Sequence, residues 1–503
     1  MFGKFRKGKS DLSGESLITV LPEKNRYPIY TQTEWYSDKW DAMDYGTDYD
    51  SNLPFFQQLQ VLQEKVPHPH QNGTKNTECD WCDDVWNSKN CYLSRSMEEC
   101  EDLFYSYRNV KVKNSVDVTV CFNSEKCYSC GECHHSYKLF YSRHSRDCLN
   151  SYFLYDCRNC QECFMCWNLR NKSYCIENIQ YIKEEYEEKL KSFNLGSYAS
   201  VQSLKKRFEE LARTEVIHRE NFNFRAFNSD GNYLEDVKNC HSCNTVNNSE
   251  DSYNCIRGMY HKSDIDANGC WYSELIGNCA HCVNAYAQKY CVWSSSRYSE
   301  YLDLCIECEY CFGCVGLKKK KHCILNKQYT KEQYEKLKNK IVEDMKKNKE
   351  YGKFLPYAMS AGPFNFSTGL LYFPETKKED ILALGGYWED INESHIEGMP
   401  TSKLPDSIKD VPDTIITKAL ICPETGWRFN IAQNELIFYR ENNIPLPRYH
   451  FDVRIKKSLK YLTVLQAYPY TCFYCHKDIK AYYLPEWGYK KIACEECYKQ
   501  NIA

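Results

Sequence analysis

The chain has 503 residues, of which 42% are hydrophobic, and its formal net charge is −3. This length allows two to four domains with separate cores, and the balanced charge gives no global electrostatic argument for binding nucleic acid or a membrane. The unusual counts are 31 cysteines and 42 tyrosines. Cysteine at this level is typical of a disulfide-bonded protein if the chain is short and secreted, and of metal sites if it is intracellular.

The N-terminal segment, residues 1–78, carries no sign of export. Its longest apolar run covers only residues 18–21, which is far shorter than the apolar core of a signal peptide. Nowhere does the chain contain about 18 consecutive apolar residues, the length needed to cross a membrane. We therefore expect a soluble, cytoplasmic protein with reduced thiols and no membrane association.

An internal duplication follows this segment. Residues 166–187 align without gaps to residues 314–335, and 12 of these 22 positions are identical. Shorter matches farther upstream keep nearly the same offset in the sequence. Residues 79–220 and 221–350 are therefore predicted to be two copies of one repeat unit.

Within each unit the cysteines follow a three-residue rhythm. Their spacings are multiples of three from Cys79 to Cys175, from Cys240 to Cys291 and from Cys305 to Cys323, with one shift of frame between the last two series. Neither a helix nor a flat strand has this period, whereas stacked solenoid turns of about 12 to 18 residues do. The predicted fold is mainly β with helical insertions: two duplicated, cysteine-laddered, β-solenoid-like repeat units, then C-terminal zinc-ribbon modules.

Short aromatic segments fit such turns, because each has the length of one strand and is flanked by Asn, Ser and Asp. They occupy residues 103–106, 139–142, 152–155, 270–273 and 291–294.

Each unit is expected to end in a helix. The first runs from Tyr181 to about Lys191 and is followed by another near residues 201–213, and the second begins at Thr330. Residues 330–333 have the pattern of a capping box, in which a Thr and a Gln side chain each accept a backbone N–H of the helix start.

The repeat cysteines allow four interpretations: packing as small hydrophobic residues, zinc binding, an iron–sulfur cluster, or a reactive thiol. The pattern is far more regular than one metal ion requires, which favours packing. Four ligands at three-residue steps on extended backbone span roughly 10 Å, so a single ion would need a tightly folded chain. The candidate metal series in the repeats are Cys157, Cys160, Cys163 and Cys166, and Cys305, Cys308, Cys311 and Cys314; Cys127, Cys130 and Cys133 form a further subset.

An iron–sulfur cluster of the ferredoxin type fits the spacing less well. It would need a three-residue last gap followed by proline, and Trp167 and Val315 stand at the proline position. No thiol is marked out from the others as a nucleophile, so no catalytic residue is predicted.

Residues 351–415 are predicted to be an α/β linker region, and residues 416–460 a degenerate zinc ribbon. In that ribbon only Cys422 and His450 have ligand side chains, while Thr425 and Val453 stand at the other two expected positions. We expect this segment to be held by packing instead of metal.

Residues 461–503 contain the clearest motif. Cys472 and Cys475 form one CxxC pair, and Cys494 and Cys497 form a second pair, with eighteen residues between the two pairs. Two such knuckles at this separation, each presented by a hairpin, build a tetrahedral zinc site. Because the protein fills all four positions, the predicted zinc is structural.

Basic residues gather beside this ribbon. Together with nearby aromatic residues such as Phe473 and Trp487, they could hold a phosphate backbone and stack on bases. The alternative is a solvated surface over a small aromatic core. The candidates for nucleic-acid contact are Arg448, Arg454, Lys456, Lys457 and Lys460.

Several segments together resemble a family of uncharacterised cysteine-repeat zinc-ribbon proteins from uncultivated bacteria with small genomes. They are residues 34–67, the "KNCYLS" and "KQYTKEQYE" stretches of the repeats, "ELIFYRENNIPLP", and the final ribbon. The resemblance covers the chain from about residue 34 onward and implies the repeat-plus-ribbon architecture and zinc, but no activity. In many members the ribbons precede the Trp-Ser-Asp-Lys-Trp-Asp segment, whereas here they follow the repeats. The first ribbon of the family usually has a full cysteine set, which this chain lacks.

Two functions follow from these observations. The first is a zinc-binding interaction scaffold that binds a macromolecular partner, protein or RNA, through the solenoid faces and the basic, aromatic C-terminal segment. The alternative is a metalloenzyme or redox protein with metal or iron–sulfur centres in the CxxCxxCxxC repeats. Phosphate-binding loops, catalytic triads and metalloprotease motifs are absent from the sequence, which favours the scaffold.

Overall fold

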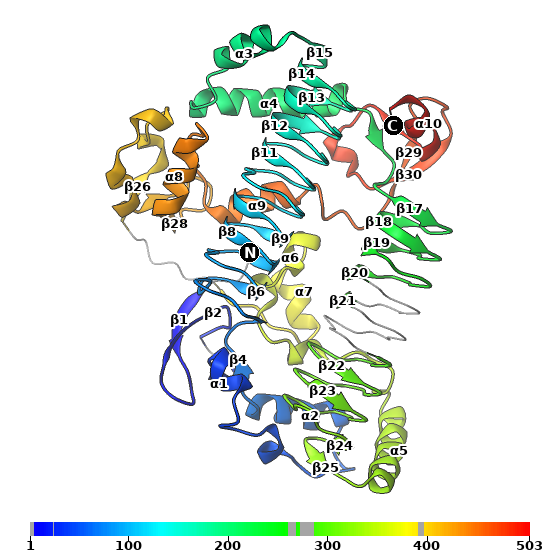
Figure 1. The fold of residues 1–503 in the computed structure, drawn as a ribbon. Helices are drawn as coiled ribbons and strands as arrows, with labels where there is room; N and C mark the ends of the chain where they lie inside the picture. Colours follow the sequence, from blue (N-terminus) through cyan, green and yellow to red (C-terminus); the bar gives the residue numbers. More distant parts are fainter. Residues whose placement is uncertain (1–4, 24, 260–267, 272–285, 391–396, 503) are drawn as a thin grey trace.

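The computed structural model describes residues 5–23, 25–259, 268–271, 286–390 and 397–502. The fold is mixed α/β, with many small sheets and, in these residues, ten α-helices, so it is less dominated by β-structure than predicted. Two columns of short, stacked strands run through it. In Figure 1 the chain ascends the first column, from β6 to β14, and descends the second, from β17 to β25.

Strands in the first column pair in parallel with a constant register. Each residue lies beside the residue twelve positions farther along, as Tyr152 beside Phe164 and Cys163 beside Cys175. The chain therefore completes one turn every twelve residues, at the short end of the predicted range. The strands are β5 (Gly73–Thr74), β6 (Asp83–Trp86), β7 (Arg95–Glu98), β8 (Glu101–Phe104), β9 (Tyr107–Val110), β10 (Lys113–Val116), β11 (Tyr137–Phe140), β12 (Leu149–Tyr155), β13 (Gln161–Trp167) and β14 (Ser173–Ile176).

A left-handed residue bends the backbone at every third position of this column. From Asp84 to Glu177 these corner residues have φ between 46° and 59°, and none of them is glycine. Each twelve-residue turn is thereby divided into four short sides. From Val85 to Cys166 the residue after each corner is buried in the column, which explains why the cysteines recur at multiples of three.

The inward positions hold small residues that satisfy the backbone. Ser142 donates its hydroxyl to the Phe140 carbonyl (2.9 Å) and accepts the N–H of Leu154, one turn farther along (2.9 Å). Cysteine thiols likewise donate to the carbonyl two residues earlier, as Cys100 does to Glu98 (3.3 Å). A buried backbone N–H without a partner is costly, so a narrow core of this kind selects serine and cysteine beside valine and leucine.

The second column repeats this arrangement, and two turns among its described residues are shorter. Phe224 lies beside Glu235 and Ser295 beside Ile306, eleven residues apart, whereas Gly231 lies beside Cys243, twelve apart. The eleven-residue turn at Ser295 accounts for the frame shift between the last two cysteine series. The strands are β17 (Phe224–Phe227), β18 (Gly231–Lys238), β19 (Cys243–Asn247), β20 (Ile256–Met259), β21 (Asn268–Trp271), β22 (Ser295–Arg297), β23 (Ile306–Glu309) and β24 (Cys323–Ile324). Cys279, Cys282 and the second half of the aromatic segment 270–273 lie outside the described residues.

Both columns end in the same kind of cap. In the first, β14 turns back into β15 (Ile179–Gln180), and α3 (Lys183–Ser192) and α4 (Tyr198–Thr214) follow. In the second, β24 turns back into β25 (Lys327–Gln328), and α5 (Lys331–Lys347) follows. The three predicted helices are present, and Thr330 and Gln333 form the predicted capping box.

The N-terminal segment packs on the second column (Figure 1). Phe55 of α2 (Phe55–Lys65) contacts Phe312, with ring centroids 5.2 Å apart. A Cβ on the corner glycine Gly313 would lie 2.4 Å from the Phe55 ring, which explains glycine there. The remaining elements of this segment are β1 (Arg6–Lys9), β2 (Ser16–Thr19), β3 (Ile29–Tyr30), α1 (Gln32–Tyr36) and β4 (His68–Pro69).

The segment after α5 returns to the first column. It contains α6 (Gly369–Tyr372), α7 (Lys378–Ala383), β26 (Met399–Pro400), β27 (Leu420–Ile421), β28 (Arg428–Phe429), α8 (Gln433–Glu441) and α9 (Phe451–Leu459). Phe451 at the start of α9 stacks on Tyr105 of the first column, with ring centroids 5.3 Å apart. Among the described residues, no helix is long and apolar enough to cross a membrane.

Candidate metal centre

The C-terminal module presents the four predicted cysteines on two tight turns. The first turn joins β29 (Tyr468–Thr471) to β30 (Asp478–Ala481). In this turn the backbone carbonyl of Cys472 accepts the N–H of His476, and the backbone N–H of Cys472 donates to the carbonyl of Lys477. The second joins β31 (Ile492–Ala493) to α10 (Glu495–Asn501), where Cys494 is the N-cap. Cys497 follows in the first turn of the helix.

These four side chains converge on one point. The sulfur atoms of Cys472, Cys475, Cys494 and Cys497 all lie within 4.8 Å of one another, and those of Cys475 and Cys494 are 3.9 Å apart. A tetrahedron with metal–sulfur bonds of about 2.3 Å has edges of about 3.8 Å, so the spacing suits one tetrahedral ion. The group could hold a metal ion, and it would leave that ion no open position.

The backbone around this group favours thiolates. Burial raises the pKa of Cys472, but hydrogen bonds from the N–H groups of Cys494, Cys475 and Tyr474 outweigh it and lower the pKa to about 6. The thiol of Cys494 raises the pKa of Cys497 to about 12. Four thiolates cannot gather here without a cation, which a bound metal would supply.

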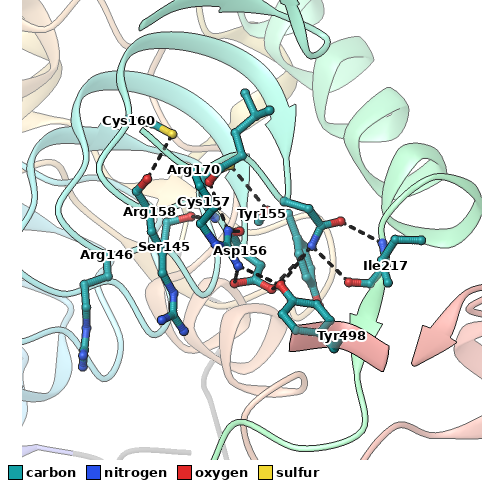
Figure 2. A network of polar contacts seen from close by, with 12 residues as sticks. Ser145, Arg146, Tyr155, Asp156, Cys157, Arg158, Cys160, Arg170, Ile217 and Tyr498 are labelled. Atoms are coloured by element: carbon teal, nitrogen blue, oxygen red, sulfur yellow. Dashed lines mark hydrogen bonds and ion pairs between the residues drawn. The ribbon is translucent and has the colours of Figure 1, made fainter. Parts of the chain in front are cut away.

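The module is anchored on the end of the first column (Figure 2). Tyr498 of α10 donates its hydroxyl to Asp156, and Arg170 donates to the Tyr498 hydroxyl (2.8 Å). β16 (His218–Arg219), which leads into the second column, pairs in parallel with β31. The C-terminal module thus joins the end of one column to the start of the next.

The repeat cysteines lie elsewhere and differently. All 23 that the structure describes are free and buried. Each candidate series fills the four inward positions of one turn, with thiols that donate to backbone carbonyls, as Cys157 does to Cys166 and Cys305 does to Cys314. Among the described residues, only the C-terminal group brings three or more such ligands within 4.8 Å of one another.

The degenerate ribbon is filled by packing contacts. Cys422 and Val453 are buried in the large core beside the first column. His450 accepts the backbone N–H of Asp452 at the start of α9 and meets the edge of the Trp427 ring. Its imidazole therefore caps a helix.

The predicted nucleic-acid contacts are only partly available at the surface. The side chain of Arg454 is only 11% exposed and pairs with Asp117 of the first column, so it offers little surface to a phosphate. Arg448 lies over the Tyr198 ring (4.2 Å) and donates to the Leu404 carbonyl.

The lysines of this set lie nearer the solvent. Lys457 pairs with Glu424 (2.6 Å), and Lys460 lies over the Tyr461 ring (4.6 Å). Lys456 is exposed. These three lysines remain accessible to a partner.

No protein-family model and no curated protein matches this chain. The resemblance to the cysteine-repeat family therefore stays a prediction.

Proposed function

We propose that the protein is a zinc-stabilised interaction scaffold that binds a macromolecular partner, protein or RNA. The observation that carries this proposal is the pair of columns, each a series of eleven- or twelve-residue turns whose corners and side faces project outward at a nearly regular interval. We infer that the columns are β-solenoids, which characteristically offer long, regular binding surfaces. A reducing, cytoplasmic setting would keep their many thiols free.

Zinc is the ion that the C-terminal group suits best. Four thiolates in tetrahedral arrangement are a soft, closed donor set, which is typical of structural zinc. The ion would fold the two turns that carry β29 and α10, and through Tyr498 it would hold this module against Asp156 of the first column. Its role would be to fix the geometry between the columns.

A second candidate function is a metal or redox centre in the repeats. It is favoured by one observation: Cys157 to Cys166 and Cys305 to Cys314 each fill a whole turn with inward thiols, at equivalent places in both columns. Against it, these thiols already donate to carbonyls inside a closed core. Iron in the purified protein, together with the visible colour of sulfur-ligated iron, would support this function.

The scaffold proposal is tested by recovering the partners of the full-length protein from its own cells after crosslinking. A protein or RNA should be enriched relative to a control recovery, in which the bait is an unrelated protein of the same length and net charge. The Cys494→Ser variant should lose enrichment if the columns must be held together. Absence of any enriched macromolecule, with turnover of a small molecule instead, would contradict the proposal.

A further inference from the structure

Three arginines form a vertical row on the first column. Arg146 lies beside Arg158, and Arg158 beside Arg170, in the parallel register of successive turns. Neighbouring turns are about 4.8 Å apart, so like charges here repel each other unless anions compensate them. The row stands next to the metal-binding module (Figure 2).

Only one end of this row is fully compensated. Arg170 pairs with Asp156 (3.4 Å) and donates to Tyr498, whereas Arg146 has Glu235 at 4.0 Å. Within the part of the chain that the structure describes, no carboxylate lies within ion-pair distance of Arg158. Burial lowers the pKa of Arg158, Arg219 and Arg170 lower it further, and Asp156 raises it.

The side chains of Arg146 and Arg158 point the same way. Figure 2 shows Arg146 and Arg158 side by side and parallel, directed away from the contacts around Asp156 and Tyr498. Arg219 of β16 adds a third cation, whose guanidinium lies over the rings of Phe222 (5.5 Å) and Tyr498 (5.0 Å). These three half-buried guanidinium groups have spare donors and a shortage of negative charge.

We propose that Arg146, Arg158 and Arg219 bind the phosphates of single-stranded RNA. The guanidinium fork matches a phosphate with two parallel hydrogen bonds, and a phosphodiester chain carries one charge per residue along a line, as this row of arginines does. An acidic protein segment offers less regular charge. The inference rests on the proposed scaffold function and assigns its RNA-binding surface to the first column instead of the cluster around Arg454.

The test uses full-length, zinc-loaded protein and a fluorescent 20-nucleotide single-stranded RNA, with affinity measured by anisotropy over a range of salt. The variant is Arg146→Gln with Arg158→Gln. For single strands, each phosphate contact contributes roughly 0.7 to the slope of the logarithm of the binding constant against the logarithm of the salt concentration. The loss of two contacts should therefore reduce this slope by about 1.4 and weaken binding about 25-fold at 0.1 M salt.

A matched control removes the same charge from other surfaces. Arg207→Gln with Arg225→Gln replaces two exposed arginines, which pair with Glu177 and Asp236, and should leave affinity within about twofold. Unchanged zinc content and thermal midpoint will show that all variants are folded.

Each remaining outcome is decisive. If the row variant binds RNA like the wild type, the surface is wrong although RNA binding stands. If the wild type binds polyglutamate but not RNA, and the row variant loses polyglutamate, the occupant is an acidic protein and the RNA proposal is overturned. If neither probe binds, the proposal is also overturned, while the scaffold function is still judged separately by partner recovery from cells.

Discussion

Serine and cysteine at the inward positions tie each turn of the columns to the next. Ser142 illustrates this, because its hydroxyl accepts the N–H of Leu154 from the following turn and donates to a carbonyl of its own turn. Cysteine is small enough for the same place and donates through sulfur. The high cysteine content is thus explained by a core that admits only small residues with some capacity to hydrogen-bond.

Replacing Ser142 with alanine should destabilise the first column. The change leaves the buried N–H of Leu154 without a partner, which costs about 1–3 kcal/mol. Ser142→Cys should cost less, because cysteine occupies equivalent positions. Denaturant unfolding measures both, with Ser203→Ala on the exposed face of α4 as the control; equal stability of Ser142→Ala and this control would contradict the proposed role.

Buried histidines should make the fold sensitive to acid. Burial lowers the pKa of His68, His218 and His450 from 6.5 to about 3. The unfolded chain therefore takes up protons below pH 6.5 that the folded chain refuses. The stability that these histidines contribute is fully present above pH 6.5 and is lost as the pH falls toward 3, at about 1.4 kcal/mol per pH unit for each histidine.

The thermal midpoint should therefore fall between pH 7 and pH 5. Asp303, whose pKa burial raises to about 6, acts in the opposite sense between about pH 6 and pH 4, but it is one group against three. His68→Phe preserves the ring contact with Tyr27 and removes one titrating group, so the stability of this variant should depend less steeply on pH. An identical pH dependence in this variant would show that His68 is not protonated on unfolding.

Among the elements, α9 is fixed to the first column by a buried ion pair. Arg454 pairs with Asp117 and lies over the Tyr105 ring, and Glu435 of α8 accepts the Tyr105 hydroxyl (2.9 Å). Lys205 of α4 also interacts with Asp117, and burial lowers its pKa to about 8. Sequence alone could not indicate that Arg454 points inward, because Asp117 is more than 300 residues away.

Arg454→Gln should therefore destabilise the protein by about 3–5 kcal/mol, because it leaves Asp117 buried without its cation. Adding Asp117→Asn should recover part of that loss. The control is Lys457→Gln, which removes an exposed cation beside Glu424 and should change stability by less than about 1 kcal/mol. If Arg454→Gln weakened RNA binding without any loss of stability, the original surface assignment would have to be restored.

The C-terminal module should need bound metal to stay folded, whereas the two columns should stay folded without it. Cys494→Ser removes one of the four ligands, so zinc should be lost and amide exchange should accelerate in β29, β30 and α10. Exchange in β12 and β13 should stay slow. The matched control is Cys422→Ser, another buried cysteine outside the group, which should keep its zinc; full zinc content in the Cys494→Ser protein would refute the site.

Features that depend on short stretches of sequence could be predicted correctly. The paired CxxC spacing located the four converging cysteines, and the capping box located the start of α5. The turn length was not readable, since a three-residue rhythm is compatible with any multiple of three. The row of Arg146, Arg158 and Arg170 becomes visible in the sequence only once a twelve-residue turn is known.

At the scale of the whole molecule, neighbours in space are distant in the chain. The N-terminal helix α2 covers the second column, where Glu350 accepts the N–H groups of Phe55 and Phe56 (both 3.0 Å). The C-terminal module in turn contacts the first column through Tyr498. These long-range contacts cannot be inferred from one sequence, because each depends on how two side-chain surfaces fit that are hundreds of residues apart in the chain.

We infer that the repeat cysteines are packing residues and that only the C-terminal four bind metal. The metal content of the purified full-length protein, determined by mass spectrometry per mole of chain, distinguishes this arrangement from metal centres in the columns. We expect one zinc per chain, no iron, and no zinc in the Cys494→Ser protein. Several metal ions per chain, or iron that persists in that variant, would contradict this inference and make the four-cysteine turns of the two columns metal centres.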